Sequence, residues 1–525
     1  MASRYRKDVR VQPVSAAAAE HSPARVHWTA AHVLIGSVSA IPIAIYLWVA
    51  GARLSFPYDL QWMEGGSVEL ARRVSNGQSL YVSPSLEVTG WPYPPLYYWV
   101  SAAVSGTTGE GYLPLRLTSI MASIVVLIAI GLLVRRSTSG GATGTVAGLA
   151  AAGLYAATYR HAGAWADTGR VDSLFLALTL VAVLIAQRAH TTRAGIAVGL
   201  AFTLACLTKQ NALIVAVPVL LWLIFRRRTA GLSATLTLTF GIAIPAVILH
   251  LGTDGWFTQY VGLQLLGHGW LPRPVLGFWL VDILIPFSIL AVSALVVRRR
   301  DRDHGQRWAI RQLADGPRAV VLSAVMGLLA AGWVGKLHSG GYDDVLMPAY
   351  AAVALLAGLL VDHVLRTDAS RSARWWVAGA LLLQIAVLGY DPRDQIPTAA
   401  DRDAAAALVA LVAAQPGRVL VLDHPFVATQ AGKISFAHGE GMVDVLRGRN
   451  GRAREALTTD LATAIEDPAI STVILDDLSE AALLGPAFVR DFELVPGTVV
   501  AGDALWPRTD VQSRPTYMYV RKTSP

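Results

Sequence analysis

The sequence predicts an all-α, polytopic membrane domain with about eleven transmembrane helices, followed by a small α/β domain at the C-terminus. Of its 525 residues, 54% are hydrophobic and only 15% are charged, and the mean hydropathy is +0.47. Long apolar runs recur as far as about residue 390, and apolarity falls from Asp391 onward. A soluble protein of this length is rarely so apolar, so the lipid bilayer is the expected solvent of the first part.

Eleven apolar runs are long enough, or nearly long enough, to form a membrane-spanning helix. They cover about residues 30–51, 113–134, 143–159, 171–187, 193–208, 211–226, 231–251, 275–297, 319–337, 346–366 and 374–390. The stretch 91–106, WPYPPLYYWVSAAVSG, is interpreted as a re-entrant or interfacial helix, because its prolines suit a helix start and its Trp and Tyr suit the headgroup region. The alternative, an ordinary span, would invert every later loop.

Lys and Arg are distributed unevenly between the two sides of this arrangement. With the N-terminus inside, the inner segments hold 22 of the 44 Lys and Arg residues and the outer segments hold 9, while the other 13 follow residue 390. Such an excess is typical of cytoplasmic loops. We therefore predict a cytoplasmic tail (1–29), a membrane domain (30–390) and an extracytoplasmic domain (391–525). The high usage of Ala, Gly and Arg favours a bacterial plasma membrane.

Charge and cysteine content argue against two classes of protein. The net charge of +8 does not indicate a nucleic-acid partner, because the basic residues form short clusters between the apolar runs. The single cysteine, Cys206, lies inside an apolar run, so neither a disulfide framework nor a CxxC metal site is present.

The C-terminal segment has the pattern of a small α/β domain. RVLVLD (418–423) and STVILDD (471–477) are short apolar runs typical of buried strands. Ala-rich stretches at about 400–414 and 452–465 predict helices around them.

The first external loop carries carboxylates beside the bilayer. Asp59 and Glu64 flank an aromatic and Met core and precede two glycines that allow a tight turn. Carboxylates near a low-dielectric region are candidate general bases. Glu69, by contrast, is spaced with Arg72 and Arg73 for pairing on the solvated face of an interfacial helix.

The second external loop and the next external turn add further charged groups. Asp167 and Asp172 come just before a predicted span, and Asp172 suits either a substrate path or an ordinary helix cap. Lys209, in LTKQNAL, stands at a turn between two apolar runs. Its ammonium could hold a lipid-linked phosphate, or it could simply extend to the membrane surface.

Two later loops reach the same predicted outer face. KLHSGGYDDVLMPAY (336–350) presents Lys336, His338 and Tyr342 around a flexible glycine pair. No second histidine lies at ligand spacing in that loop, so we expect His338 to form hydrogen bonds rather than bind a metal, and we expect Asp343 and Asp344 to be solvated. Arg273, in an aromatic loop at about 252–274, could reach a phosphate.

These motifs resemble a known family of membrane enzymes. The features are the acidic first loop followed by ARRVSNGQSLY (71–81), then YPPLYYW (93–99), the acidic second loop, and the TKQ turn (208–210). Over roughly residues 30–390 the sequence resembles the GT-C superfamily of glycosyltransferases, close to the protein mannosyltransferase and aminoarabinose transferase branch, which is glycosyltransferase family 39-like.

The resemblance implies a reaction. Such enzymes transfer a sugar from a polyprenyl-phosphate donor, with inversion, to a cell-envelope glycan, lipid or protein outside the membrane, and a first-loop carboxylate deprotonates the acceptor. The branch has adjacent Asp and Glu where this chain has Met63 and Glu64. We favour Glu64 as the base, with Asp59 as its substitute or partner.

The resemblance also implies roles for the other candidates. Asp167 and Asp172 would orient the acceptor or bind a divalent metal, the one cofactor that this pattern leaves open. The donor phosphate would be held by the residues Lys209, Lys336, Arg273, His338 and Tyr342.

Two other functions fit parts of the sequence. A transporter or flippase of lipid-linked sugar would also need many spans with polar residues inside them, although we find no inverted repeats. A non-catalytic scaffold could use the external α/β domain to bind a wall polymer or a protein, although charged clusters converging on one face argue against it.

Overall fold

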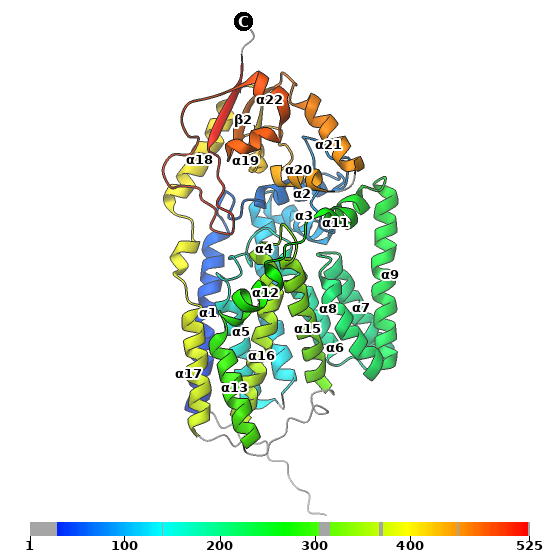
Figure 1. Cartoon of the computed structure of the whole chain (residues 1–525), viewed down its shortest axis with the longest axis vertical. Coiled ribbons are helices and arrows are strands. Elements are labelled where there is room, and N and C mark those ends of the chain that lie inside the picture. The colour runs from blue at the N-terminus through cyan, green and yellow to red at the C-terminus, as the bar shows by residue number, and fades with distance from the viewer. Residues whose placement is uncertain (1–28, 139, 304–315, 367–370, 449–450, 523–525) are drawn as a thin grey trace, which may run out of the picture.

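The computed structural model describes residues 29–138, 140–303, 316–366, 371–448 and 451–522. Long helices run side by side through the lower two thirds of the molecule, and a smaller α/β region lies at the end where the C-terminus is found (Figure 1). The predicted cytoplasmic tail, apart from Thr29, lies outside the described residues. Thr29 accepts a hydrogen bond from the backbone of His32 and so begins the first helix.

Five helices of the described chain are long and apolar enough to cross a membrane, or up to seven if each of two bent pairs is one span. The five are α1 (Ala30–Arg53), α4 (Tyr112–Arg136), α9 (Arg228–Gly252), α15 (Gly316–Lys336) and α16 (Leu346–Arg366). Three apolar helices have only 15 residues each: α6 (Asp172–Ala186), α7 (Thr192–Cys206) and α8 (Ala212–Arg226). Since 15 residues extend about 22 Å, the number of eleven crossings stays a prediction.

Every predicted apolar run nevertheless coincides with helix, including α5 (Gly141–Ala157) and α17 (Arg371–Val387). The run predicted at 275–297 differs, because it is not one straight helix. Its two halves, Pro274–Leu284 and Ser288–Arg302, are bent by 77°. Pro286 lies in the break and cannot donate a backbone hydrogen bond, which explains the interruption.

The stretch interpreted as interfacial forms α3 (Leu96–Thr108), a helix of 13 residues that starts directly after Pro95. About 20 Å of helix is too short for a full crossing. The helix packs between α2 (Glu64–Ser75) and α4 at the junction with the α/β region. Its depth in a bilayer stays a prediction.

A four-stranded sheet forms the centre of the C-terminal region, in the order β1-β2-β4-β3. Its strands are β1 (Arg418–Val421), β2 (Ile470–Leu475), β3 (Phe492–Leu494) and β4 (Tyr517–Arg521). The first two are parallel and the other pairings are antiparallel. The predicted strands and the predicted helices, α18 (Ala399–Ala414) and α21 (Gly451–Ala464), are confirmed, whereas β3 and β4 were not predicted. The predicted fold class is confirmed.

The loop after α1 belongs to the core of this C-terminal region. Phe56, Tyr58 and Leu60 alternate inward and pack with Val421 and Ile474 of the sheet in a separate buried cluster. Three short helices complete the region: α19 (Pro425–Gln430), α20 (Gly439–Arg447) and α22 (Gly485–Asp491). Because α19 also contacts α2, the α/β region is fixed on the first loop of the helical region.

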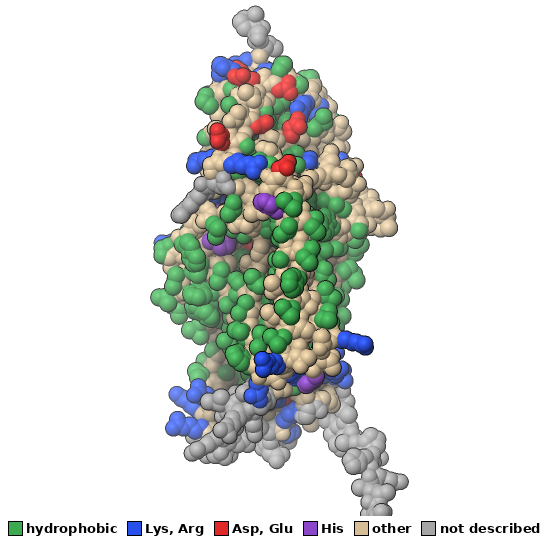
Figure 2. All heavy atoms as spheres, turned by 90° about the vertical axis from the view of Figure 1, so that its right-hand side faces the viewer, with side chains coloured by type: hydrophobic (Ala, Val, Ile, Leu, Met, Phe, Trp, Pro, Cys, Tyr) green, Lys and Arg blue, Asp and Glu red, His purple; other side chains and the backbone are tan. Residues whose placement is uncertain are grey.

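The surface of the helical region is apolar. Hydrophobic side chains cover the middle of the molecule, Lys and Arg gather at the lower end, and acidic side chains are visible at the upper end (Figure 2). On α9, Leu236, Phe240 and Ile248 are more than half exposed. Such a belt is stable in lipid and not in water, so the chain is a multi-pass membrane protein.

Candidate active site at the junction of the two regions

An inner cavity lies where the helical region meets α20 of the α/β region. Loops that are far apart in the sequence contribute to it, namely those that follow α2, precede α6, join α7 to α8, and precede α16. Its polar and aromatic lining includes Trp91, Tyr93, Trp165, Arg170, Lys209, His268, His338, Tyr342, Asp344, Glu440 and Asp444.

Arg170 is the central cation of the inner cavity, and its side chain has no anionic partner in the described part of the chain. Its guanidinium lies 5.4 Å from the ring centroid of Trp91, 5.5 Å from that of Tyr93 and 5.6 Å from that of Trp165. It donates a hydrogen bond of 3.3 Å to Ser67 Oγ, while Nε is buried without a partner. Arg170 is only 4% exposed. A buried cation without a counter-ion is costly, so this position favours binding of an anion.

Lys209 lines the same cavity, and two carboxylates hold it in place. Its Nζ lies 2.5 Å from Asp172 Oδ1 and 2.8 Å from Asp344 Oδ2. The prediction that Asp344 is solvated is wrong, since the side chain is buried and paired. Asp172 is the first residue of α6 and makes no side-chain cap, so the ordinary cap considered for it is not found, while its role in a substrate path stays a prediction. The trio bears a net negative charge, which leaves Arg170 as the cation available for direct contact with an anion.

Histidine and tyrosine side chains complete the wall of the inner cavity. The rings of His268 and His338 lie 5.8 Å apart. Burial lowers the pKa of His338, so its ring is neutral and acts through hydrogen bonds. Tyr342 lies between Trp62 and Trp165, at centroid distances of 6.2 Å and 6.5 Å. Three predicted residues, Lys209, His338 and Tyr342, therefore share one cavity.

Glu64, the favoured base, is fully occupied by other contacts. Its carboxylate accepts hydrogen bonds from Arg116 Nε at 2.8 Å and Nη2 at 2.7 Å, and from the backbone N–H groups of Leu60 at 2.9 Å and Gly169 at 2.7 Å. Both side chains of the ion pair have no exposed surface. A carboxylate offers about four acceptor positions, so none remains for an acceptor hydroxyl. These contacts favour a structural role.

Asp59 also lies outside the inner cavity, in contact with the α/β region. Its Oδ2 is 2.6 Å from Nδ1 of His424, whose Nε2 is 2.9 Å from Asp476 Oδ2. Burial raises the pKa of Asp59. Burial alone would lower the pKa of His424, but the carboxylates of Asp476 and Asp59 on its two sides raise it well above the ordinary value. The three side chains form a buried clamp between the first loop and the sheet.

Asp167 belongs to a third buried group, in which it pairs with Arg53 and not with Lys209. Its Oδ2 is 3.1 Å from Arg53 Nε, and its Oδ1 accepts a hydrogen bond of 2.8 Å from Tyr159. Arg53 also donates to Thr509 of the C-terminal region at 2.9 Å. Within the described ranges, no group of three or more His, Cys, Asp or Glu side chains is arranged to hold a metal ion.

Two predicted phosphate ligands do not line the inner cavity. Lys336 forms an ion pair of 2.8 Å with the half-exposed Asp343 at the end of α15. Arg273 is exposed at the start of α12 (Pro274–Gly277). The expected role of these two residues stays a prediction without a supporting contact.

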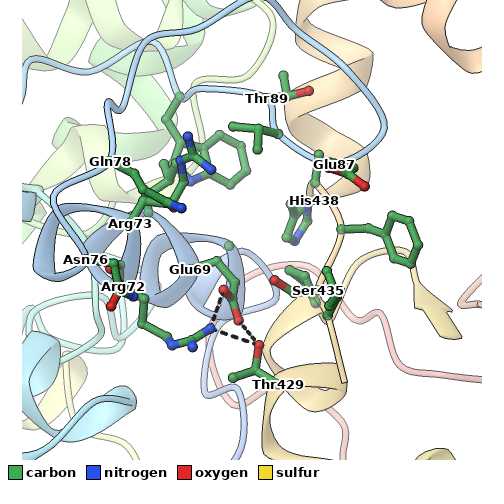
Figure 3. Close-up of a pocket in the computed structure, with 18 of the residues that line it drawn as sticks. Glu69, Arg72, Arg73, Asn76, Gln78, Glu87, Thr89, Thr429, Ser435 and His438 are labelled. Carbon is green, nitrogen blue, oxygen red and sulfur yellow. Dashed lines mark hydrogen bonds and ion pairs between the residues drawn. The ribbon is translucent and has the colours of Figure 1, made fainter. Parts of the chain in front are cut away.

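An outer cavity of about 400 Å³ lies next to the inner one, between α2 and the segment 425–438. Figure 3 shows Arg73, Asn76 and Gln78 on one side of it and Ser435 on the other. Arg72 spans the two sides, since it donates to Glu69 at 2.8 Å and to Thr429 at 3.0 Å. Trp91 lines both cavities, so a single aromatic wall lies between them.

The sequence reasoning missed Arg170 and Glu440 as candidates. Arg170 stands between Asp167 and Asp172 in the sequence, a spacing that suggests an ion pair, yet the two carboxylates bind Arg53 and Lys209 instead. The rings that surround it come mainly from the YPP motif far upstream. Aromatic residues in a loop next to an unexplained arginine were the available signal. No sequence pattern marked Glu440, because it reaches the inner cavity only through the packing of the α/β region on the helical region.

Comparison with known proteins identifies the architecture. Residues 93–251 match the sequence profile of a family described as dolichyl-phosphate-mannose-protein mannosyltransferase. ArnT from Cupriavidus metallidurans in the apo state is similar over 92% of this chain and 97% of that chain, with 14% identity and a TM-score of 0.52. The fold is that of the GT-C glycosyltransferases. The resemblance proposed from the motifs is therefore confirmed.

The structure of the same ArnT bound to undecaprenyl phosphate is also similar over 92% of this chain and 97% of that chain, with 14% identity and a TM-score of 0.50. No curated protein sequence matches the chain. At this identity the structural likeness defines the fold, and the chemistry must be argued from the cavities themselves.

Proposed function

We propose that the protein transfers a sugar, a hexose or a pentose, from a polyprenyl-phosphate donor to a cell-envelope acceptor. The reaction would take place at the outer face of the bacterial cell membrane, with the C-terminal α/β region on that side. The observation that carries the proposal is the buried guanidinium of Arg170, surrounded by three aromatic rings and free of any described carboxylate contact. A phosphate supplies the missing charge.

The donor occupies the inner cavity with its phosphate on Arg170. When the bond from the sugar to the phosphate breaks, negative charge grows on the phosphate oxygens, and a preorganised guanidinium stabilises it. Lys209, held by Asp172 and Asp344, fixes the shape of the cavity beside Arg170. His338, as a neutral ring, contributes hydrogen bonds. This arrangement needs no nucleotide.

The acceptor enters from the outer cavity, whose lining of Arg, Asn, Gln, Ser and Thr side chains suits a hydroxyl-rich molecule. Trp91, which faces both cavities, would separate the acceptor from the lipid-linked donor. Glu64 and Asp59 act as positioning residues in this scheme, because their contacts fix the first loop to α4 and to the α/β region. The hypothesis that Glu64 is the base remains open to direct test.

The experiment compares wild-type protein with Arg170→Met in detergent, using a radiolabelled polyprenyl-phosphate sugar and cell-envelope acceptors. Loss of a charged hydrogen-bonding contact costs about 1.5–3 kcal/mol, so the KM for the donor should rise by roughly 10-fold to 150-fold. The control is Arg193→Met, an exposed arginine of α7. An unchanged KM in Arg170→Met contradicts the proposed phosphate site. Movement of donor across liposomes without transfer would instead indicate a flippase.

A further inference from the structure

We propose that Glu440, on the first turn of α20 in the α/β region, is the general base that deprotonates the acceptor hydroxyl. The proposal rests on the proposed function and replaces the expected first-loop base. Neither Glu64 nor Asp59 lines the inner cavity, and each is engaged by a buried cation. The base must therefore be sought among the carboxylates that do line it.

Three carboxylates of the described chain line the inner cavity, and two of them are engaged. Asp344 accepts a charged hydrogen bond of 2.8 Å from Lys209. Asp444 lies 3.3 Å from Arg447 Nη1 and 3.3 Å from His268 Nε2. Glu440 also has an ion pair, at 3.4 Å from Arg447 Nη2, but among the described residues of the cavity wall its carboxylate accepts no hydrogen bond. It is therefore the one of these three carboxylates whose oxygens keep their hydrogen-bonding positions for a substrate.

Glu440 stands on the stretch of chain that joins the two cavities. His438, two residues earlier, lines the outer cavity, whereas Glu440 lines the inner one. The backbone N–H of Glu440 donates to His438 Nδ1 at 3.1 Å, and His438 Nε2 donates to the Trp62 carbonyl at 3.0 Å. His438 is thus a neutral ring with both nitrogens engaged, and burial lowers its pKa to about 3. It orients the turn and cannot serve as the base itself.

The surroundings of Glu440 suit proton transfer near neutral pH. Burial, and then the neighbouring Asp444, raise the pKa of Glu440 to about 7, against the opposing effects of Arg447, His268 and Arg170. Tyr342 also faces Glu440, and Tyr93, Lys209, His338 and Asp344 line the same cavity. A base with a pKa near the working pH combines a substantial ionised fraction with the strongest driving force for accepting a proton.

The acceptor hydroxyl gives its proton to a carboxylate oxygen of Glu440 while its oxygen forms a bond with the anomeric carbon. The bond from that carbon to the phosphate oxygen breaks on the opposite side, and the electron pair leaves with polyprenyl phosphate. Arg170 stabilises the phosphate, and Glu440 then releases its proton to water.

The test measures transfer and donor binding separately in wild type, Glu440→Gln and Glu440→Asp. We expect kcat to fall by about 100-fold or more in Glu440→Gln, while the dissociation constant for polyprenyl phosphate changes by less than about 2-fold. The wild-type rate should rise with pH through about 7 and level off above it. That rise should disappear in Glu440→Gln and persist, at a lower rate, in Glu440→Asp. Glu455→Gln, on the exposed face of α21, is the matched control.

The outcomes separate the two proposals. No transfer by wild type from any polyprenyl-phosphate donor would overturn the proposed function itself. Transfer by wild type together with near-normal kcat in Glu440→Gln would overturn only the assignment of the base. Loss of polyprenyl phosphate binding in Glu440→Gln would also overturn it, because that residue would then act in donor binding.

Discussion

The first loop and the inner cavity both concentrate buried charge, but they satisfy it differently. In the first loop, the Glu64 carboxylate accepts four hydrogen bonds. Its partner Arg116 also donates to the backbone carbonyls of Phe56 and Tyr58. In the inner cavity, Arg170 contacts aromatic rings, donates long hydrogen bonds to the hydroxyls of Ser67 (3.3 Å) and Tyr93 (3.5 Å), and leaves Nε without a partner. The first arrangement is complete without a ligand, and the second is not.

This difference is the basis of the donor site that we propose. A buried ion pair with all its hydrogen bonds made stabilises a loop geometry, and removing one partner leaves an uncompensated charge. A buried cation with an unfilled position lowers its free energy by binding an anion. Acidic residues near the membrane therefore need not be catalytic, and the buried cation with an unfilled position is the group that we propose for donor binding.

The largest expected effect comes from breaking the complete pair. Arg116→Leu leaves Glu64 buried and unpaired, and it also removes the donors to the carbonyls of the first loop. We expect a loss of about 3–5 kcal/mol in the free energy of unfolding. The loss would appear as a lower midpoint in thermal unfolding of the detergent-solubilised protein, followed by tryptophan fluorescence.

A double variant sharpens this comparison. Arg116→Leu combined with Glu64→Leu removes both charges, so it should recover a large part of the lost stability. If the single variant unfolds at the wild-type midpoint, the pair is not structural, and Glu64 regains its place as a candidate base.

Much of the fold could be predicted from the sequence. Apolar length and turn residues are local signals, so the apolar runs, α18, α21, β1 and β2 were predicted close to their observed bounds. Strands β3 and β4 were missed because FEL has only three residues, and because the short apolar run in YMYVR stands alone near the C-terminus without a second run beside it. The bend around Pro286 depends on packing as well as on the proline.

The site was predictable only in part, because chemistry near a cavity depends on distant partners. Lys209, His338 and Tyr342 were placed correctly as neighbours from the loops that carry them. The ion pair between Glu64 and Arg116 could not be predicted, because the two residues are 52 positions apart in the sequence and Arg116 lies within an apolar run. Similarly, His424 gave no sign in sequence that it contacts Asp59.

A smaller, pH-dependent effect should come from the clamp of Asp59, His424 and Asp476. The pKa of His424 and that of Asp59 are both raised in the folded protein. The stability that His424 contributes is therefore fully present below its ordinary pKa of about 6.5 and is lost as the pH rises toward the raised value. Each such proton contributes a slope of up to about 1.4 kcal/mol per pH unit.

His424→Gln tests this effect, because glutamine can hydrogen-bond to a carboxylate but cannot carry the charge. Thermal midpoints measured from about pH 6 to about pH 9 should fall with pH more steeply in wild type than in the variant. Asp423 and Glu480 also have raised pKa values and remain in both proteins, so the difference between the two slopes is the informative quantity. Equal slopes would show that His424 is neutral in the folded state.

The smallest effect is expected at the rim of the outer cavity, where the same kinds of charge are exposed. Arg72 Nε contacts Glu110 at 2.7 Å, but the Glu110 side chain is 41% exposed, and Arg72 retains Glu69 as a second partner. Glu110→Gln should change the free energy of unfolding by less than about 1 kcal/mol and transfer by less than about 2-fold. Added salt should shrink even this difference, since exposed charges are screened. A loss comparable to that of Arg116→Leu would mean that hydrogen-bond geometry, rather than burial, decides which ion pairs support this fold.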